Sequence, residues 1–267
     1  MGVLFLCMFT AWFSGEARLL QLNLNVGDRW IEEEVLDMSH HVEGVPGKSV
    51  TKAKSRQRFH VVSGPDEGVY KIKVTFESFE EHELTGLNPM DFSKLLGKSF
   101  MISQNMNGKV LDVEPPEGLD QDQKQVFQFY KQRYLTDSLE AYFPKKEVKP
   151  HDSWANDLSI TMDVNGIYFD HHIQLNCRFE GMEDKNGRES VKLAFKGTSD
   201  GQINQGSFGS TNGEAEGFMW LDPNHGFPYL IESKGVYRMD LITPMGNQKA
   251  IFNMKSTRIR LDDEAVQ

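Results

Sequence analysis

The sequence predicts a mainly β protein, built from antiparallel sheets in two similar β units that are joined by one long α-helix. Three observations support this prediction. Apolar and polar residues alternate along most of the chain, Asn-Gly pairs stand where hairpins would turn, and one long segment has helical spacing instead. Alternation implies sheets with one buried face and one wet face, which is typical of antiparallel pairing. The pattern leaves open whether the units form one curved half-barrel or a sandwich.

The chain begins with an apolar run, residues 3–13, that is too short to cross a bilayer as a lasting anchor. Small residues follow at Gly15 and Ala17, a spacing that suits signal peptidase. We therefore predict a signal peptide over residues 1–17, cleavage before Arg18, and an exported protein that is periplasmic or extracellular. The alternative interpretation is a buried N-terminal strand.

Strand signals fill the chain on both sides of the helical segment. Leu20, Leu22 and Leu24 alternate with polar residues at the start of the predicted mature chain. The same period of two recurs in three further places, at residues 72–76, 191–195 and 237–241. Each of these segments is expected to form a strand whose alternate side chains are buried.

Four Asn-Gly pairs and one Pro-containing segment predict tight turns, because their residues tolerate a positive φ or preset a turn conformation. They are Asn107-Gly108, Asn165-Gly166, Asn186-Gly187, Asn212-Gly213 and residues 64–68. A Gly-, Ser- and Asn-rich stretch at residues 197–217 has two interpretations. It is either a mobile binding loop or a pair of hairpin strands with glycines where backbones approach closely, and the flanking strand patterns favour the hairpin.

The helical segment extends from Gln121 to Tyr142 and contains neither Gly nor Pro. Its apolar residues recur at helical spacing and cover an arc wider than one narrow stripe. Either Asp120 or Asp122 is expected to cap its start. A second, shorter helix is predicted over residues 89–96, with Gly97 ending it.

The chain repeats its landmarks in two halves. Residues 27–30 (Gly-Asp-Arg-Trp) open the first half and residues 151–154 (His-Asp-Ser-Trp) open the second, with a hairpin after each at similar spacing. The repeat predicts that Trp30 and Trp154 are buried at equivalent positions. The predicted organisation is a signal peptide at 1–17, a first antiparallel β unit at 18–117, a helical connector at 118–142, a second antiparallel β unit at 143–262 and an acidic tail at 263–267.

Short motifs accompany these landmarks: Gly27-Asp28-Arg29-Trp30, Gly68-Val69-Tyr70, and Phe143-Pro144 followed by Asp152-Ser153-Trp154. Together they resemble an uncharacterised family of exported bacterial proteins, a domain of unknown function with a Gly-Asp-aromatic opening in each β-rich half. His151 stands where that family has Gly in the second opening. The resemblance covers nearly all of the mature chain and implies an envelope or periplasmic β protein. It brings no catalytic residues.

The net charge of −10 disfavours binding to nucleic acid or to anionic lipid, because both partners are negatively charged. Cys177 is the only cysteine of the predicted mature chain, so no internal disulfide can form. A lone cysteine in an alternating strand pattern is expected to act as a small buried apolar residue.

No residue pattern marks a catalytic, cofactor or metal site. The sequence lacks Gly-x-Ser-x-Gly, His-Glu-x-x-His, Cys-x-x-Cys and phosphate-loop spacings. Asp170 and His172 share one face of a predicted strand, which makes them the candidates for a carboxylate–histidine pair. A secreted hydrolase with dispersed carboxylates or histidines is therefore the alternative function.

Aromatic residues provide the candidates for a ligand-lining surface. These are Phe127, Tyr130 and Tyr134 on the predicted helix, and Trp220 on a predicted strand. Aromatic stripes at helical spacing usually belong to protein cores, so a structural role is the competing interpretation. We predict an exported, non-enzymatic envelope or periplasmic protein that uses no cofactor and binds an apolar small molecule or an envelope protein.

Overall fold

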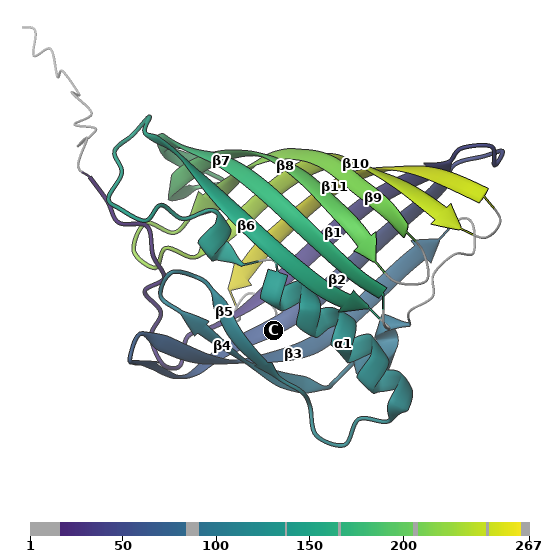
Figure 1. Ribbon diagram of the computed structural model, residues 1–267. Coiled ribbons are helices and arrows are strands. Elements are labelled where there is room, and N and C mark those ends of the chain that lie inside the picture. Colours follow the sequence, from purple (N-terminus) through teal and green to yellow (C-terminus); the bar gives the residue numbers. More distant parts are fainter. Residues whose placement is uncertain are drawn as a thin grey trace, which may run out of the picture.

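The computed structural model describes residues 17–83, 91–136, 138–164, 167–204, 208–243 and 246–262. Within these ranges the chain forms eleven strands, one α-helix and two short 3-10 helices (Figure 1). Their bounds are β1 (Arg29–Val42), β2 (Ser49–Asp66), β3 (Val69–Glu83), η1 (Phe92–Leu95), β4 (Ser99–Asn105), β5 (Val110–Glu114), α1 (Gln121–Thr136), η2 (Leu139–Ala141), β6 (Ser153–Val164), β7 (Ile167–Lys185), β8 (Arg188–Asn204), β9 (Phe208–Leu221), β10 (Pro228–Thr243) and β11 (Gly246–Asp262).

The strands form one antiparallel sheet in the order β5-β4-β3-β2-β1-β11-β10-β9-β8-β7-β6. Each half of the chain is a meander of neighbouring strands, and the halves meet where β1 pairs with β11, with Trp30 opposite Asp262. The predicted mainly β, antiparallel fold is therefore confirmed. The strands of both predicted units belong to one continuous sheet, and the internal repeat itself stays a prediction.

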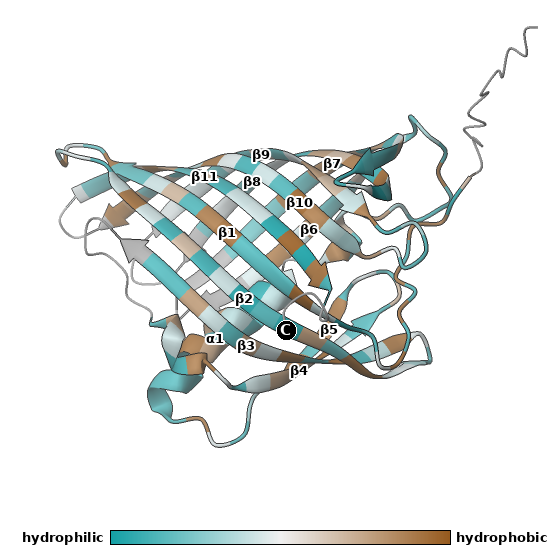
Figure 2. Ribbon diagram, turned by 180° about the vertical axis from the view of Figure 1, so that it is seen from behind, coloured by the Kyte–Doolittle hydropathy of each residue, from teal (hydrophilic) through white to brown (hydrophobic). Residues whose placement is uncertain are grey.

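The sheet curves around α1, which contacts both edge strands, β5 and β6 (Figures 1 and 2). We call the face turned toward α1 the inner face. Three contacts define it: Arg133 on α1 pairs with Glu34 on β1, Tyr134 donates a hydrogen bond to Gln57 on β2, and the rings of Tyr142 and Phe195 lie 5.0 Å apart. The opposite, solvent-facing side is the outer face.

The helix begins where the sequence predicts and ends earlier. The Asp120 carboxylate accepts a hydrogen bond from the backbone N–H of Gln123 at 2.8 Å, and the Gln123 side chain accepts one from the N–H of Asp120 at 3.1 Å. This reciprocal capping box satisfies two helix-terminal donors and identifies Asp120 as the cap. The predicted end at Tyr142 is wrong, because α1 stops at Thr136.

One side of α1 packs on the first half of the sheet. Phe127 and Tyr130 are buried there. The Phe127 ring lies 5.5 Å from the ring of Phe100 on β4, and the Tyr130 ring lies 4.7 Å from that of Phe76 on β3, both edge to face. Such aromatic pairs contribute about 0.5–1.5 kcal/mol each beyond the area they bury. The apolar arc predicted for the helix is therefore largely core.

A second packed region closes one end of the inner face, and we call it the closed end. Trp30 is fully buried there, with its ring stacked on Phe59 at 5.1 Å and tilted against Phe227 at 4.8 Å. The guanidinium of Arg260 lies 4.5 Å from the Trp30 ring centre, a cation–π contact. Aromatic rings and the Arg260 side chain thus fill this end of the sheet.

The segment before β1 crosses the closed end, and its predicted strand is wrong. Leu20, Leu22 and Leu24 are buried as their alternation suggested, but they lie outside the strands. The backbone instead bonds to separate elements: the N–H of Leu22 donates to the Met106 carbonyl at 2.7 Å, and that of Leu24 to the Tyr70 hydroxyl at 3.2 Å. A period of two can arise in any extended chain that lies on a core.

The predicted turns divide into correct, wrong and undescribed ones. Asn186-Gly187 joins β7 to β8 with a positive φ at both residues, and Gly108 turns the chain between β4 and β5. Asn165-Gly166 lies outside the described residues. Asn212-Gly213 is not a turn, because both residues lie inside β9. The favoured hairpin at residues 197–217 is confirmed, since β8 and β9 pair across it.

Two further sequence predictions hold in part. The short predicted helix at residues 89–96 appears as η1 from Phe92 to Leu95, and its first two residues lie outside the described ones. Trp30 and Trp154 each stand second in the first strand of their half. Trp30 is fully buried, whereas Trp154 on the edge strand β6 is half-buried and donates a hydrogen bond to the Tyr142 carbonyl at 3.1 Å.

Candidate ligand-binding site

Beyond the closed end, the inner face is apolar but only partly covered. On β11, residues 251–255 alternate between exposed and half-buried positions, and the half-buried ones, Phe252 and Met254, face inward. The strand pairing extends these positions across the sheet. We call this region the open trough, and its larger half-buried apolar side chains include Leu36, Met38, Leu158, Ile160, Ile173, Tyr237, Met239, Phe252 and Met254.

The trough contains a hollow of about 300 Å³ between the segment that follows α1 and the inner face of β6 to β10. Its walls are mostly apolar, and they include Leu158, Ile173, Leu175, Phe195 and Tyr237. A volume of this size is at the lower limit of small-molecule sites in proteins. The hollow and the half-buried strand positions together make this part of the inner face mostly apolar.

Glycines form much of the trough floor on the central strands. Gly213 lies opposite Tyr237 on β10, and Gly217 lies opposite Phe195 on β8. A Cβ added at either glycine would collide with the ring beside it. The rings therefore pack directly against bare glycine backbone, a known way to support glycines within a sheet. This packing explains why Asn212-Gly213 is strand rather than turn.

A charged cluster lies between the closed end and the open trough. Glu34 on β1 accepts from Arg133 of α1 at 2.5 Å and lies 3.6 Å from Arg258 of β11. Arg258 also lies 3.4 Å from Glu32. Two carboxylates thus face two guanidinium groups, so the cluster is balanced in charge. It joins the helix to the middle of the sheet.

Tyrosines of α1 border this cluster. Tyr130 and Tyr134 line a small pocket of about 40 Å³ with Glu32, Gln57 and Arg133. The Tyr134 hydroxyl donates to the Gln57 side-chain oxygen. Burial raises the pKa of Tyr130 to about 12 and that of Tyr134 well above its ordinary value. Both hydroxyls therefore stay protonated near neutral pH and act as uncharged donors.

Polar groups reappear toward the other end of the trough. His171 on β7 and Thr211 on β9 face inward on either side of Gly201, and the His171 Nδ1 lies 3.4 Å from the Thr211 hydroxyl. Burial lowers the pKa of His171. The imidazole is therefore predominantly neutral at pH 7.

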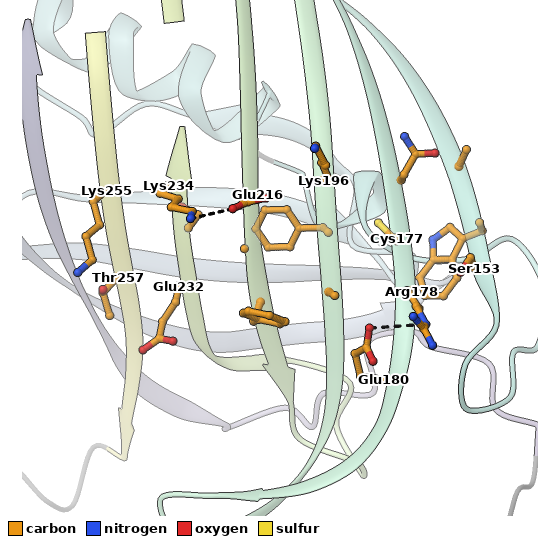
Figure 3. Close-up of a pocket in the computed structure, with 18 residues that line it drawn as sticks. Ser153, Cys177, Arg178, Glu180, Lys196, Glu216, Glu232, Lys234, Lys255 and Thr257 are labelled. Carbon is orange, nitrogen blue, oxygen red and sulfur yellow. Dashed lines mark ion pairs between the residues drawn. The ribbon is translucent and has the colours of Figure 1, made fainter. Parts of the chain in front are cut away.

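The outer face has a larger hollow, of about 870 Å³, over β6 to β11 (Figure 3). Charged side chains surround it: Lys234 pairs with Glu216 at 2.8 Å, and Arg178 with Glu180 at 3.6 Å. Phe218 is its exposed aromatic residue, at 42% exposure. Solvated ion pairs are costly to cover with an apolar ligand. The inner hollow is therefore the better candidate for apolar binding, although the outer one is larger.

The four predicted lining residues lie in three places. Phe127 and Tyr130 belong to the core between α1 and the sheet, and Tyr134 faces the charged cluster. Trp220 is buried on the outer face, where its indole N–H donates to Glu183 at 3.3 Å and Lys185 lies 4.1 Å from the ring centre. The structure does not bring these four residues together around one hollow.

Sequence reasoning missed most of the trough walls. Tyr237 begins one of the alternating segments and is expected on a buried strand face. Ile173 and Leu175 lie in the alternating pattern around Cys177, so the sequence singles out none of the three as a ligand-lining residue. The signal available was the combination of apolar inward positions with inward glycines at Gly213 and Gly217 on β9, which lies beside β10 and two strands from β7. Glycines at inward positions remove side chains from the floor, and apolar residues around them leave an apolar space.

The other candidates for chemistry lie apart from the trough or are buried. Asp170 accepts a hydrogen bond from Thr161 at 2.8 Å on the outer face. His172 lies 3.6 Å from Asp200, also outside. Cys177 is 2% exposed, as predicted for a buried apolar residue, and burial raises its thiol pKa to about 12. Among the described residues, no group of three potential ligands could hold a metal ion.

No family model and no curated protein matches this chain. A solved structure titled "lipid-protein interactions in lipovitellin" is similar in fold, with a TM-score of 0.52 and 10% identity over 90% of this chain and 25% of the lipovitellin chain. A DUF1329 family protein from Desulfovibrio piger has a TM-score of 0.24 and 9% identity, over 86% of this chain and 85% of that one. A Rhodopseudomonas blastica porin triple mutant has a TM-score of 0.29 and 9% identity, over 87% and 100%.

These similarities differ in what they establish. The chain spans about a quarter of the lipovitellin chain, and the similarity there concerns the fold alone, because the identity is 10%. The other two TM-scores are too low to support an argument. Among the described residues, none of the helices has the length and apolar character needed to cross a membrane.

Proposed function

We propose that this protein binds an apolar small molecule in the open trough and serves as a non-enzymatic carrier or receptor for it. The observation that carries the proposal is the partly uncovered apolar inner face, which continues from a fully packed closed end. Fully burying one large apolar side chain contributes about 1.5–3 kcal/mol. Ile173, Phe252 and Met254 are only half-buried, so a bound ligand that covers them would gain part of that free energy.

Two further observations support the proposal. The walls of the 300 Å³ hollow are mostly apolar, as in most small-molecule sites. The lipovitellin structure with the similar fold is described as one of lipid–protein interactions. That description concerns lipovitellin, and we extend it to this chain only as part of the proposal.

An apolar fluorescent probe tests the binding. Titration of the purified protein should give a saturable rise in fluorescence, and native mass spectrometry should detect retained apolar ligand. Ala215→Phe places a ring on the inner face of β9 and should weaken binding by about tenfold or more, about 1.4 kcal/mol. Asn212→Phe adds the same ring to the outer face of the same strand and is the matched control.

The outcome is decisive in both directions. Loss of affinity in Ala215→Phe with retained affinity in Asn212→Phe supports the trough as the site. Equal affinities for both variants and the unaltered protein would place the probe elsewhere. The absence of saturable binding by any apolar probe or retained lipid would refute the carrier function.

We also propose that the protein works outside the cytoplasm, after cleavage between Ala17 and Arg18. The apolar run at residues 3–13 and the small residues that follow support this proposal. N-terminal sequencing of the protein from cell fractions tests it. A mature chain that starts at Arg18 in the exported fraction is expected, and an intact Met1 in the cytoplasm would contradict it.

A further inference from the structure

We propose that the ligand is an amphiphile with a long, unbranched acyl chain, which lies along the strands of the open trough with its polar head at the end near His171. This inference rests on the proposed function and specifies its ligand. Three features of the trough support it: its length, its small hollow, and the difference in charge and packing between its two ends.

The length of the trough matches an extended acyl chain. Inward positions on β1 run from Leu36, beside the charged cluster, to Val42 near the end of the strand. Six residues of strand span about 20 Å at about 3.3 Å per residue. The hydrocarbon core of a bilayer is about 30 Å thick, so one leaflet holds chains of about 15 Å. The trough can therefore cover one membrane-type chain along its length.

The small volume of the hollow favours a slender ligand. Its volume of about 300 Å³ is small, and the rings of Tyr237 and Phe195 lie on the glycine floor of β8 to β10. These rings limit the width of the space between the walls. A flexible chain can follow such a space, whereas a rigid polycyclic ligand needs a broader one.

The charged cluster disfavours a polar head group at the end of the trough that adjoins the closed end. Glu34 already accepts from Arg133, faces Arg258 and receives a hydrogen bond from the Ser256 hydroxyl at 3.4 Å. A further charge there would be desolvated without a new partner of opposite sign, which is unfavourable. Beyond the cluster, Trp30 and its neighbours fill the closed end.

The opposite end offers polar contacts. His171 and Thr211 face inward there, one on each side of Gly201. Their ring nitrogen and hydroxyl are hydrogen-bonding groups within 3.4 Å of each other. An amphiphile bound with its chain toward Leu36 and its head near His171 therefore buries its apolar part and places its polar part beside hydrogen-bonding groups. A free fatty acid and a lysophospholipid share this chemistry.

A chain-length series tests the ligand class. Saturated fatty acids from octanoate to stearate, and lysophosphatidylcholines with the same chains, should compete with the fluorescent probe. Each added methylene should tighten binding about fourfold until the chain fills the trough, after which the affinity should level off. In Ala215→Phe the plateau should come at a shorter chain, whereas Asn212→Phe should leave the series unchanged.

Spin-labelled fatty acids test the orientation. A nitroxide near the carboxylate should broaden the imidazole resonances of His171, and one near the methyl end should leave them sharp. The reverse pattern would overturn the orientation. Binding of the apolar probe without any dependence on chain length, together with tighter binding of a sterol, would overturn the ligand class while the proposed function stands. If no apolar probe binds, the proposed function itself fails.

Discussion

The closed end and the open trough are two parts of the same inner face, formed by the same strands, yet they are packed in opposite ways. At the closed end, Trp30 is stacked between Phe59 and Arg260 and is fully buried. On the same two central strands, Leu36 and Met254 remain half-buried. The sequence alternation is similar in both places, so alternation alone does not decide whether a face becomes core.

The difference lies in what covers each region. The closed end receives side chains from outside the sheet, including Leu22 from the segment before β1 and Phe227 from the loop before β10. The helix covers the inner side of β3 and β4. Among the described residues, the trough receives only the edge of the segment around Tyr142. Apolar strand faces become core only where other parts of the chain reach them.

The largest expected effect is a difference in stability loss between substitutions in the closed end and in the open trough. Trp30→Ala should lower the free energy of unfolding by about 3–5 kcal/mol, because it removes a fully buried aromatic side chain. Phe252→Ala, at a half-buried position of the trough, should cost markedly less. Denaturant unfolding followed by circular dichroism measures both. Equal losses would mean that the trough is packed like the closed end, and the comparison would fail.

A smaller effect is expected at the boundary between the regions. Glu34→Gln should destabilise the fold by about 1–3 kcal/mol, because Arg133 and Arg258 then lose a charged acceptor. Glu33→Gln, the next residue on the same strand, removes the outer-face pair with Lys54 and should cost less than about 1 kcal/mol. Urea titrations compare the two variants. A greater loss in Glu33→Gln would contradict the proposed role of the cluster in holding α1 on the sheet.

The smallest effect concerns Cys177, which packs with Leu175 and Phe195 beside the trough. Burial holds its thiol pKa at about 12, whereas an unfolded thiol titrates near 8.5. Between these values the unfolded state has lost the proton and the folded state keeps it, so stability should fall as pH rises through this window. Cys177→Ala should remove this part of the alkaline slope.

A thiol reagent provides the direct measurement. In a chain that begins at Arg18, Cys177 is the only thiol. At pH 8 the native protein should react slowly with Ellman's reagent, and unfolding in urea should restore rapid reaction. Rapid labelling of the native protein would mean that the trough opens to solvent beside Cys177.

The fold class could be predicted from sequence because strand alternation and the Asn186-Gly187 turn are local signals. The same signals misled where long-range packing decides the outcome. Residues 20–24 alternate in polarity because this extended segment lies across a core. Asn212-Gly213 resembles a turn sequence because the Tyr237 ring packs against the backbone of Gly213 and leaves no space for a side chain. The end of α1 at Thr136 likewise follows from the packing of the next segment, since Ser138 donates to the Gly108 carbonyl at 3.0 Å.

The site was less accessible to sequence reasoning than the fold. The predicted aromatic lining residues lie mostly on the helix, where Phe127 and Tyr130 are conspicuous in the sequence. In the structure both rings are part of the hydrophobic core. Inward positions such as Ile173 and Tyr237 look like ordinary strand residues. Whether such a position is covered depends on the curvature of the whole sheet, to which no short stretch of sequence gives access.

The pairing of β1 with β11 also determines when the sheet can be completed. Trp30 and Asp262 are partners across the sheet although almost the whole chain separates them. During synthesis, the first strand emerges long before its second neighbour and presents an unpaired edge in the meantime. Contacts this distant in sequence slow folding. The protein therefore has a vulnerable period in which its earliest strand can pair with another chain, and any factor that shields β1 during that period would favour correct folding.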